Sequence, residues 1–416
     1  MDANEIKKVV AEGSVLSCSG AIHACKKSNL RLELNANSGI YELKGKLHKD
    51  ETALFKNLCP SLGCDYNQLI QFVFNSKPNT PLGHVKKTFV AQSTNFDRNY
   101  RASSGGLVKE VLLDLLENKE IDSAISVMKT GPLVHEPRII TTADEIESMP
   151  TSIYHMLDYT KMIPLLENQN HKKMALVCVP WQLDDVYPYI SKMRPELKSK
   201  IVITIGLLFG WYFTHKSIDA LCCYYNINKN ELDDIQYRGK GRVGKIRFIF
   251  RDGKVKEYPR FNSQSKAASE RYYTTKGFLT YVNTHNMLAD IVVGDDHTVE
   301  GSLSKTGTNL VVVRTERGMV TINSMIANQR IKAIPVENDK LVESQKRERL
   351  YGDMAYSYSQ FLRDIGEFGP VYQVPNKKYA LQLNKSLLRK FHHKYQQRYK
   401  MQIAVKIYPY IIHKEN

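Results

Sequence analysis

The sequence predicts an α/β fold in which a mostly parallel or mixed sheet is covered by helices, with an α+β arrangement as the alternative. Three observations support this class. Apolar runs rich in β-branched residues occur in the middle of the chain, and segments with helical spacing follow them. The 416 residues are also 42% hydrophobic and 25% charged. That composition is typical of a globular protein and excludes a disordered or collagen-like chain.

Residues 96–235 contain the clearest alternation of strand and helix. The helix expected at 106–117 carries six apolar residues at helical spacing, namely Leu107, Val108, Val111, Leu112, Leu115 and Leu116. Buried strands are expected at 124–128, 174–179 and 201–208, and helices near 183–193 and 215–225. Strands that alternate with helices favour a parallel sheet with both faces covered.

Three further regions complete the predicted organisation. Residues 1–95 are expected to be loop-rich and contain four of the seven cysteines. Residues 236–336 are expected to be strand-rich, with a hairpin whose strands (245–250 and 255–258) flank Asp252-Gly253 and further strands at 289–294 and 310–314. Residues 337–416 form a basic, mostly helical extension. We interpret its amphipathic segment 384–399 as a surface helix, with binding to an anionic surface as the alternative.

The charge balance points to an anionic partner. Lys and Arg total 59 against 43 Asp and Glu, which gives a net charge of +16. This surplus suits nucleic acid, a membrane surface or a phosphate-bearing ligand. The longest apolar run, 201–213, is too short to span a bilayer, and the first residues lack the order of a signal peptide. We therefore expect a cytoplasmic protein without a transmembrane segment.

The N-terminal cysteines partly match the spacing of an iron–sulfur run. A bacterial ferredoxin run is C-x2-C-x2-C-x3-C-P, because a cluster needs closely spaced thiolates. If Cys18 and Cys25 take its second and fourth positions, Val15 and Ala21 stand at the other two and Lys26 replaces the proline. Cys59 and Cys64 are the further N-terminal cysteines that could join Cys18 and Cys25. These four cysteines are the candidate metal ligands, but we do not expect a cluster.

A second candidate site precedes the helix at 107–117. Ser103 and Ser104 are suited to cap free backbone N–H groups, and Gly105 and Gly106 let another group approach the backbone closely. The positive end of the helix dipole adds attraction for an anion. We predict a phosphate or anion site here, with a plain capped helix start as the alternative.

Three shorter motifs follow predicted strands. Residues 179–182 (VPWQ) follow a buried strand, where Gln182 has an amide able to bond a polar ring edge. In residues 238–241 (RGKG), Arg238 and Lys240 suit phosphate recognition. Residues 294–297 (GDDH) suit metal binding or acid–base chemistry. The alternatives are a rigid turn, a solvated basic turn and a capped turn.

Taken in order, these segments resemble one family, the beta subunit of the deazaflavin-coenzyme hydrogenases and dehydrogenases. Residues 101–107 (RASSGGL) are very close to its most specific signature, and 238–241 match its "RGKG". Residues 289–295 (ADIVVGD) and 307–315 (GTNLVVVRT) are similar to its "ADISVGD" and "GTSLVIVRT". Residues 59–61, 179–182 and 205–210 resemble its "CPG", "TPCQ" and "IGLFCG". The resemblance covers roughly residues 10–350.

The resemblance implies an FAD-binding subunit that passes electrons between iron–sulfur clusters, flavin and a second substrate. This chain departs from the pattern at the cysteines, and 1–95 looks like a degenerate ferredoxin-like region. Other residues stand at six positions where the family carries thiols: Val15, Ala21, Trp181, Phe209, Phe278 and Tyr281. The flavin-region motifs are better preserved than the cluster motifs.

We therefore predict an FAD-dependent oxidoreductase that passes electrons between a diffusible donor, a nicotinamide or deazaflavin, and an unknown substrate, without iron–sulfur clusters. The residues at 103–106 would hold phosphate or a ring edge. Arg238 and Lys240 would neutralise the pyrophosphate, and Gln182 would orient the ring. The alternative is a non-catalytic relative that binds an anionic ligand or partner, with polysaccharide biosynthesis as one setting. We do not expect nucleic-acid binding, because no recognisable motif is present.

Overall fold

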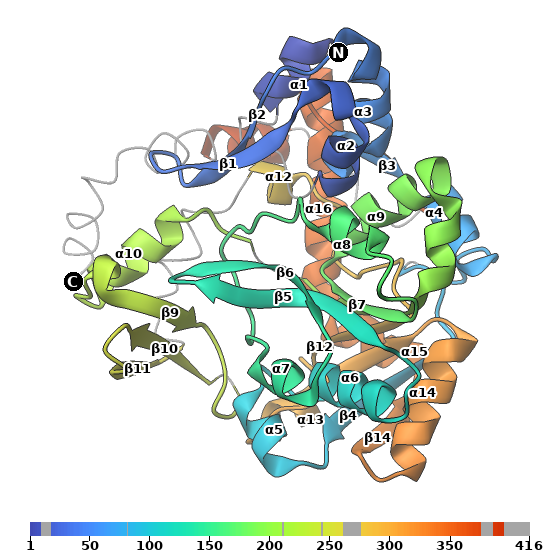
Figure 1. The fold of residues 1–416 in the computed structure, drawn as a ribbon, viewed down its shortest axis with the longest axis vertical. Helices are drawn as coiled ribbons and strands as arrows, with labels where there is room; N and C mark the ends of the chain where they lie inside the picture. Colours follow the sequence, from blue (N-terminus) through green and yellow to red (C-terminus); the bar gives the residue numbers. More distant parts are fainter. Residues whose placement is uncertain are drawn as a thin grey trace.

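Eight strands form one mixed sheet that runs through the middle of the molecule (Figure 1). The structure is a computed structural model and describes residues 1–9, 18–80, 82–209, 212–242, 244–260, 276–375 and 386–394. The strand order is β14-β4-β13-β12-β8-β7-β5-β6. The strands are β4 (Lys87–Ser93), β5 (Ser123–Gly131), β6 (Val134–Ile140), β7 (Met174–Cys178), β8 (Ile201–Leu207), β12 (Ile291–Asp295), β13 (Asn309–Val313) and β14 (Ile331–Val336).

The centre of this sheet is parallel and its margins are antiparallel. β5, β7, β8 and β12 pair in parallel, whereas β6, β13, β4 and β14 join by antiparallel pairing. Every residue of β7 and β13 is buried. Strands that are buried on both faces need apolar side chains at successive positions, which explains the continuous apolar runs. The α/β class and the mixed sheet predicted from the sequence are confirmed.

Helices cover both faces of the sheet, and the alternation along the strands shows how. Val292 and Val312 pack into one core cluster, and Val293 and Val311 pack into the other. The first cluster includes side chains of α2 (Ser19–Ala24), α3 (Thr52–Leu58), α4 (Tyr66–Phe74), α8 (Met162–Glu167), α9 (Pro180–Met193), α15 (Asn338–Ser344) and α16 (Lys346–Asp364). The second includes side chains of α6 (Leu107–Glu117), α7 (Ala143–Ser148) and α14 (Glu316–Ala327).

A small antiparallel sheet lies beside the large one (Figure 1, left). It consists of β9 (Leu232–Gln236), β10 (Lys245–Phe250) and β11 (Val255–Pro259), and α10 (Lys216–Tyr224) packs on it through Ile218 and Leu221. The hairpin predicted around Asp252-Gly253 is confirmed as β10 and β11. The predicted helices at 106–117, 183–193 and 215–225 correspond to α6, α9 and α10.

The two ends of the chain contain more regular structure than the sequence indicated. Residues 1–95 were expected to be loop-rich, but they contain α1 (Ala3–Val9), α2, α3, α4, the hairpin β1 (Arg31–Asn35) and β2 (Ile40–Lys44), and β3 (Gly63–Asp65), which pairs with β15 (Val371–Gln373). These helices have six to nine residues, too few for a clear apolar period. The predicted 384–399 helix is seen at 386–394, and its other residues lie outside the described ones.

The large sheet crosses the boundaries predicted at residues 95 and 235. β4 lies before residue 95, yet it pairs with β13 and β14. β12, β13 and β14 fall in the predicted strand-rich region and share the sheet with β5, β7 and β8. The division into four regions stays a prediction. No helix among the described residues is both long enough and apolar enough to cross a bilayer.

The centre of the sheet has no room for a larger residue at Gly206 of β8. A Cβ atom there would lie 2.6 Å from the Cβ atom of Ala289 and 2.6 Å from the Asn286 side chain. That amide donates to the carbonyl of Cys178 at 2.9 Å, so it cannot move without losing the bond. We expect Gly206→Ala to lower the free energy of unfolding by about 1–3 kcal/mol, measured by urea denaturation.

Gly131→Ala is the matched control for this substitution. Gly131 lies in β5, where the nearest atom to a Cβ is that of Val134 at 3.7 Å, an ordinary contact. Its free energy of unfolding should stay within about 0.5 kcal/mol of wild type. Equal stability of the two variants would contradict the close packing of β8.

Candidate functional site

The motifs predicted to form a site come together at the carboxyl end of β12. The first is the signature loop, residues 102–106, between α5 (Phe96–Arg101) and α6. The second is the basic turn, residues 238–242, between β9 and β10. The third is the β13 loop, residues 304–308, between α13 (Val299–Leu303) and β13. Segments separated by more than 60 residues thus meet at one edge of the sheet.

The signature loop is packed directly against β13 and the loop before it. The hydroxyl of Ser104 donates to the carbonyl of Thr308 at 2.6 Å. A Cβ atom on Gly105 would lie 2.6 Å from Oδ1 of Asn309 and 2.8 Å from the carbonyl oxygen of Ala91. Gly106 has a φ of 79°, which favours glycine. Both glycines are therefore required by the way the loop lies against the sheet.

The basic turn packs against the end of α5, directly before the signature loop. Gly239 has a φ of 121°, and a Cβ atom there would lie 2.7 Å from the carbonyl oxygen of Arg101. The N–H of Gly241 donates to the carbonyl of Tyr100 at 2.9 Å. The N–H of Arg242 donates to the carbonyl of Lys305 at 2.9 Å, which links the turn to the β13 loop. The three segments hold one another in place through backbone contacts.

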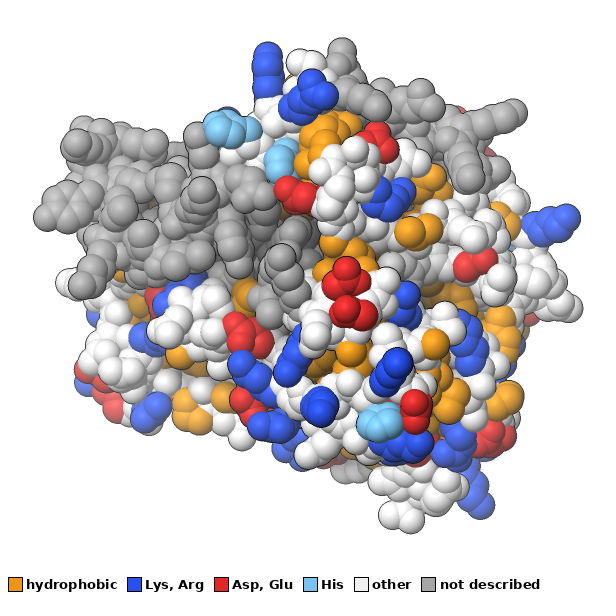
Figure 2. Space-filling model, turned by 90° about the horizontal axis from the view of Figure 1, so that it is seen from above, with side chains coloured by type: hydrophobic (Ala, Val, Ile, Leu, Met, Phe, Trp, Pro, Cys, Tyr) orange, Lys and Arg blue, Asp and Glu red, His pale blue; other side chains and the backbone are white. Residues whose placement is uncertain are grey.

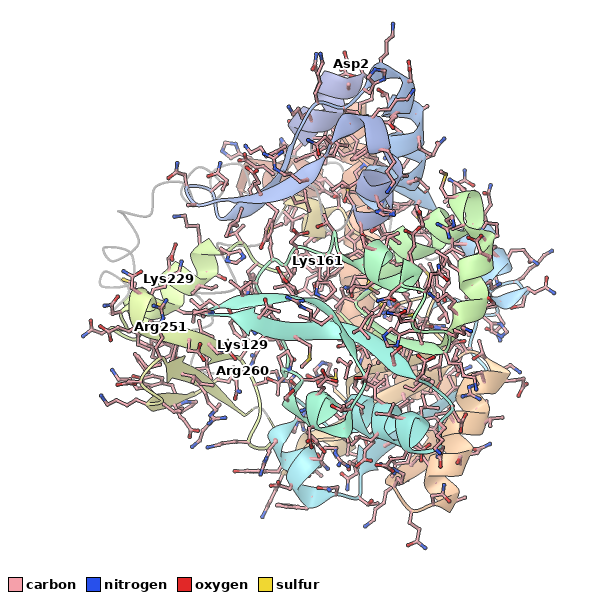
Figure 3. The ribbon with its side chains drawn as sticks, in the orientation of Figure 1. Asp2, Lys129, Lys161, Lys229, Arg251 and Arg260 are labelled. Carbon is pink, nitrogen blue, oxygen red and sulfur yellow. The ribbon has the colours of Figure 1, made fainter. Side chains whose placement is uncertain are left out.

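Other side chains support this arrangement. Ser152 donates its N–H to the hydroxyl of Ser103 at 3.1 Å, and Thr151 donates to the carbonyl of Arg238 at 3.1 Å. Arg260, labelled in Figure 3 beside the small sheet, donates to the carbonyl of Tyr237 at 2.6 Å. Sequence reasoning missed these residues, because nothing local in the sequence relates 151–152 to the two motifs they connect.

The surroundings of Gly105 differ from the expected ones. We expected its missing side chain to leave room for a ligand, but Asn309 and Ala91 fill that space. What the loop offers instead is open backbone donors. In the described part of the chain, no hydrogen bond uses the N–H groups of Ser103, Ser104, Gly105 or Gly106. Four open N–H groups before the 11-residue helix α6 suit a phosphate or another oxyanion.

The two cations of the basic turn are both paired with carboxylates. The guanidinium of Arg238 lies 2.5 Å from Asp295, at the end of β12, and its side chain is only 13% exposed. Burial alone would lower the pKa of Arg238, but Asp295 outweighs it and raises the pKa. Lys240 lies 2.5 Å from Glu257 and is 36% exposed. Hydrogen bonds from Lys240 and Lys245 lower the pKa of Glu257 to about 2.

Gln182 and Trp181 lie at the start of α9, which follows β7, two strands from β12 in the sheet. The side-chain oxygen of Gln182 accepts the N–H of Val179 at 2.8 Å and so caps the helix. Trp181 is 1% exposed, and the centroid of its ring lies 4.2 Å from the ring centroid of Phe209 and 5.7 Å from that of Tyr281. The ring centroids of Phe209 and Phe278 lie 5.5 Å apart. These residues form an aromatic cluster: Trp181, Phe209, Phe278 and Tyr281.

Comparisons with known proteins agree on one family. Residues 88–164 match the model for the N-terminal part of the coenzyme F420 hydrogenase/dehydrogenase beta subunit. Residues 171–339 match the model for the C-terminal part of the same protein. Together the two segments span more than half of the chain. The chain belongs to the coenzyme F420 hydrogenase/dehydrogenase beta subunit family.

A solved structure supports the same fold. A chain from the F420-reducing NiFe hydrogenase complex of Methanosarcina barkeri is 20% identical, with a TM-score of 0.55. The alignment covers 72% of this chain and 99% of that chain. No curated protein matches this chain in sequence.

The positions of the four aromatic residues can be compared with the cysteine positions of the family. The resemblance described in the sequence analysis implies that all four residues stand at cysteine positions of the family, although they are spread over 101 positions of the sequence. The structure brings these four side chains into one buried group, each at most 8% exposed. The space between the four positions is therefore occupied by rings packed edge to face.

A buried carboxyl group adjoins this cluster. Asp184 of α9 is fully buried and accepts hydrogen bonds from the hydroxyl groups of Tyr66 and Tyr281 and from the amide of Asn283. Burial raises its pKa to about 7, although all three hydrogen bonds act in the opposite direction. Tyr281 therefore has two contacts at once, its ring with Trp181 and its hydroxyl with Asp184.

The N-terminal cysteines lie elsewhere, and all are free thiols. Cys18, Cys25 and Cys59 are each 1% exposed and lie together between α2 and α3. Burial and a hydrogen bond with Cys59 raise the pKa of Cys18. Cys64 packs against the same core cluster, and burial and Asp184 raise its pKa. Among the described residues, no group of three or more His, Cys, Asp or Glu has the geometry of a metal site.

The GDDH segment is used structurally. Asp295 pairs with Arg238, as described above. Asp296 accepts the N–H of Thr298 at 3.0 Å and its hydroxyl at 2.7 Å, at the start of α13. The capped turn, which the sequence left as the alternative to metal or acid–base chemistry, is what the geometry shows.

The raised pKa of Asp184 makes stability depend on pH. The ordinary pKa of this group is 3.8, so between about pH 4 and pH 7 the folded state holds the proton more tightly than the unfolded state. The free energy of unfolding should therefore fall as pH rises through this range, by up to about 1.4 kcal/mol per unit from this group. Asp184→Asn should lose this component, measured by urea denaturation from pH 5 to 8.

Asp252→Asn is the control for this experiment. Asp252 lies on the exposed β10–β11 turn, where the hydrogen bond from Lys254 lowers its pKa. It therefore stays ionised throughout the tested range in both states. Its curve should run parallel to that of wild type. A parallel curve for Asp184→Asn as well would show that Asp184 is already ionised at pH 5.

Proposed function

We propose that this chain is an FAD-dependent oxidoreductase that passes electrons between a diffusible donor, a nicotinamide or a deazaflavin, and a second substrate, without iron–sulfur clusters. One contrast supports the proposal. The signature loop, the basic turn and the β13 loop are retained and meet with open donors, whereas aromatic rings occupy four cysteine positions. The family membership supplies the reaction class, and this contrast favours the cluster-free form.

The signature loop would hold the phosphate groups of the cofactor. Its four open N–H groups precede α6, whose dipole favours negative charge there. Lys240 would add a charge-assisted contact, since it is partly exposed and held by an exchangeable ion pair with Glu257. Arg238 is buried against Asp295, so its part is to hold the turn in position. Bound FAD would supply the hydride and electron chemistry.

The absence of clusters is proposed on chemical grounds. An iron–sulfur cluster needs thiolates, and rings at four ligand-like positions provide none. Among the described residues, Cys18, Cys25, Cys59 and Cys64 do not form a group with the geometry of a metal site. A flavin without clusters can take up electrons as a pair, which a nicotinamide or deazaflavin delivers by hydride transfer.

The first test is the composition of the protein as purified under anaerobic conditions. We expect FAD at close to one per chain, measured by absorbance and chromatography after denaturation, with little iron or sulfide. Reduction by a nicotinamide or deazaflavin should then bleach the flavin absorbance. Four iron atoms per chain would overturn the cluster-free form while leaving the flavin assignment intact.

The second test uses two lysines that share one carboxylate. Lys240 lies 2.5 Å and Lys245 3.1 Å from different oxygens of Glu257, but only Lys240 belongs to the basic turn. Lys240→Asn should weaken FAD binding about 10- to 100-fold, the loss expected for one charged hydrogen bond. Asn suits the left-handed φ of 62° at this position. The dissociation constant is measured by fluorescence titration of flavin-free protein.

Lys245→Asn is the matched control. It removes a cation from the same Glu257 but from outside the turn, so FAD affinity should change less than about threefold. Equal losses in both variants would indicate a general charge effect. No loss in either would remove Lys240 from the binding site.

A non-catalytic relative that binds an anionic ligand is the second candidate. The ion pairs of Arg238 and Lys240 weigh against a flavin pyrophosphate at the basic turn, because carboxylates already balance both cations. On the face shown in Figure 2, Lys and Arg side chains are interspersed with acidic and apolar ones, an arrangement that suits a small anion better than a nucleic acid. Protein that holds no flavin and gains none on titration would establish this candidate instead.

A further inference from the structure

A buried guanidinium that has no carboxylate partner lies on the face of the sheet opposite α6. Arg314 directly follows β13 and is 1% exposed. Its Nη1 donates to the carbonyl of His84 at 2.5 Å and its Nη2 to the carbonyl of His285 at 3.2 Å. Its Nε has no partner among the described residues, and none of their carboxylates lies within 4.0 Å of the guanidinium. A buried charge of this kind is costly unless an opposite charge accompanies it.

Three neighbouring side chains share the same deficit. Nδ1 of His84, Nε2 of His285 and Nε of Arg349 are buried and have no hydrogen-bond partner in the described part of the chain. His84 and His285 are the residues whose carbonyls hold Arg314. Burial, then Arg314, then Arg349 lower the pKa of His285 to about 3. Open donors and positive charge thus come from three separate segments.

The acidic groups near this cluster do not balance it. Asp353 lies one turn beyond Arg349 on α16, and burial raises its pKa to about 6, although Arg349 acts in the opposite direction. The carboxylate of Asp290 instead accepts hydrogen bonds from the N–H and the hydroxyl of Thr204, each at 2.7 Å. Burial lowers the pKa of Arg314 to about 9, with no carboxylate to oppose it.

This cluster is separate from the signature loop. Arg314 follows the last residue of β13 and Asn309 is its first, so about 16 Å of strand lies between them. Leu310 and Val312 face the core cluster beneath α9 and α16, and Arg314 continues this alternation beside Met287 and Gly83. Gly83 has a φ of 93°, and a Cβ atom there would lie 3.4 Å from Nη1. α6 lies on the opposite face.

We propose that Arg314, Arg349, His84 and His285 form a second, buried site for an oxyanion with the chemistry of a phosphate. The guanidinium would contribute Nε and its free Nη donors, and the two imidazoles would donate from the nitrogen atoms that are now unpartnered. The ligand is either free phosphate or a phosphate group of a larger molecule. The site is independent of the proposed flavin chemistry, because no residue of the signature loop contributes to it.

Thermal unfolding in inorganic phosphate tests the proposal. The midpoint of the wild-type protein should rise by about 3 °C or more when phosphate replaces chloride at constant ionic strength, since a ligand that binds only the folded state stabilises it. In Arg314→Met this rise should disappear. Arg314→Lys keeps one charge but loses the fork of donors, and should retain only part of the rise.

Arg317→Met is the matched control. Arg317 lies three residues further along and already has a carboxylate partner, Glu120. Its phosphate-dependent rise should equal that of wild type. A purely structural role for Arg314, as a tie between two carbonyls, predicts a lower midpoint in Arg314→Met with the same phosphate dependence as wild type. That result would overturn the proposal, as would a wild-type midpoint insensitive to phosphate in protein that releases no phosphate on denaturation.

Analysis of the denatured wild-type protein identifies the source. Free phosphate in the released fraction indicates the ion, and phosphate recovered only in a nucleotide or flavin indicates a group of a larger ligand. Lys240→Asn separates this site from the flavin site, because it should lose FAD affinity and keep the phosphate-dependent rise. Loss of both in Lys240→Asn would mean that one ligand fills both places and would overturn an independent site.

Discussion

The candidate site depends on the close approach of three backbone segments at the carboxyl end of β12. Gly105 lies against Asn309 and Ala91, and Gly239 lies against Arg101. Gly307 lies against Ser104. A Cβ atom on any of these glycines would lie 2.6–3.2 Å from the nearest atom of that neighbour. Side chains at these glycines would separate the segments. Because the approach fixes the loop before α6 on the sheet, it also fixes the direction of its open N–H groups. The glycine pattern therefore sets the site's shape before any ligand is present.

The two cationic regions differ in how their charge is balanced, and this sets what each can do. At the basic turn, Asp295 and Glu257 balance Arg238 and Lys240, so a ligand there must compete with a carboxylate. Lys240 can exchange partners because it is 36% exposed, whereas Arg238 is only 13% exposed and would lose more if its pair with Asp295 were broken. Arg314 has no such competitor. A small anion is therefore favoured beside Arg314, and a larger ligand with several contacts beside the signature loop.

The sequence predicted those features whose cause is local. β7 and β8 could be recognised because strands buried on both faces need continuous apolar residues, α6 because its apolar period is long, and the β10–β11 hairpin because Asp252-Gly253 favours its turn. β6 and β14 went unrecognised, since edge strands with half-exposed residues lack such runs. The sequence also could not predict why glycine is needed at position 105, because the residues that contact it, Asn309 and Ala91, come from distant parts of the chain.

The same limit explains why the aromatic cluster could not be foreseen. Trp181, Phe209, Phe278 and Tyr281 are spread over 101 positions of the sequence, but in the structure they pack as one group. Replacing one ring with the much smaller cysteine would leave a cavity among the other three, at a cost of about 3–5 kcal/mol. It would also supply only one thiolate of the several that a cluster needs. Tyr281 carries a further constraint, because its hydroxyl supports the buried Asp184. The aromatic residues thus stabilise one another, and a single substitution to cysteine would not create a cluster site here.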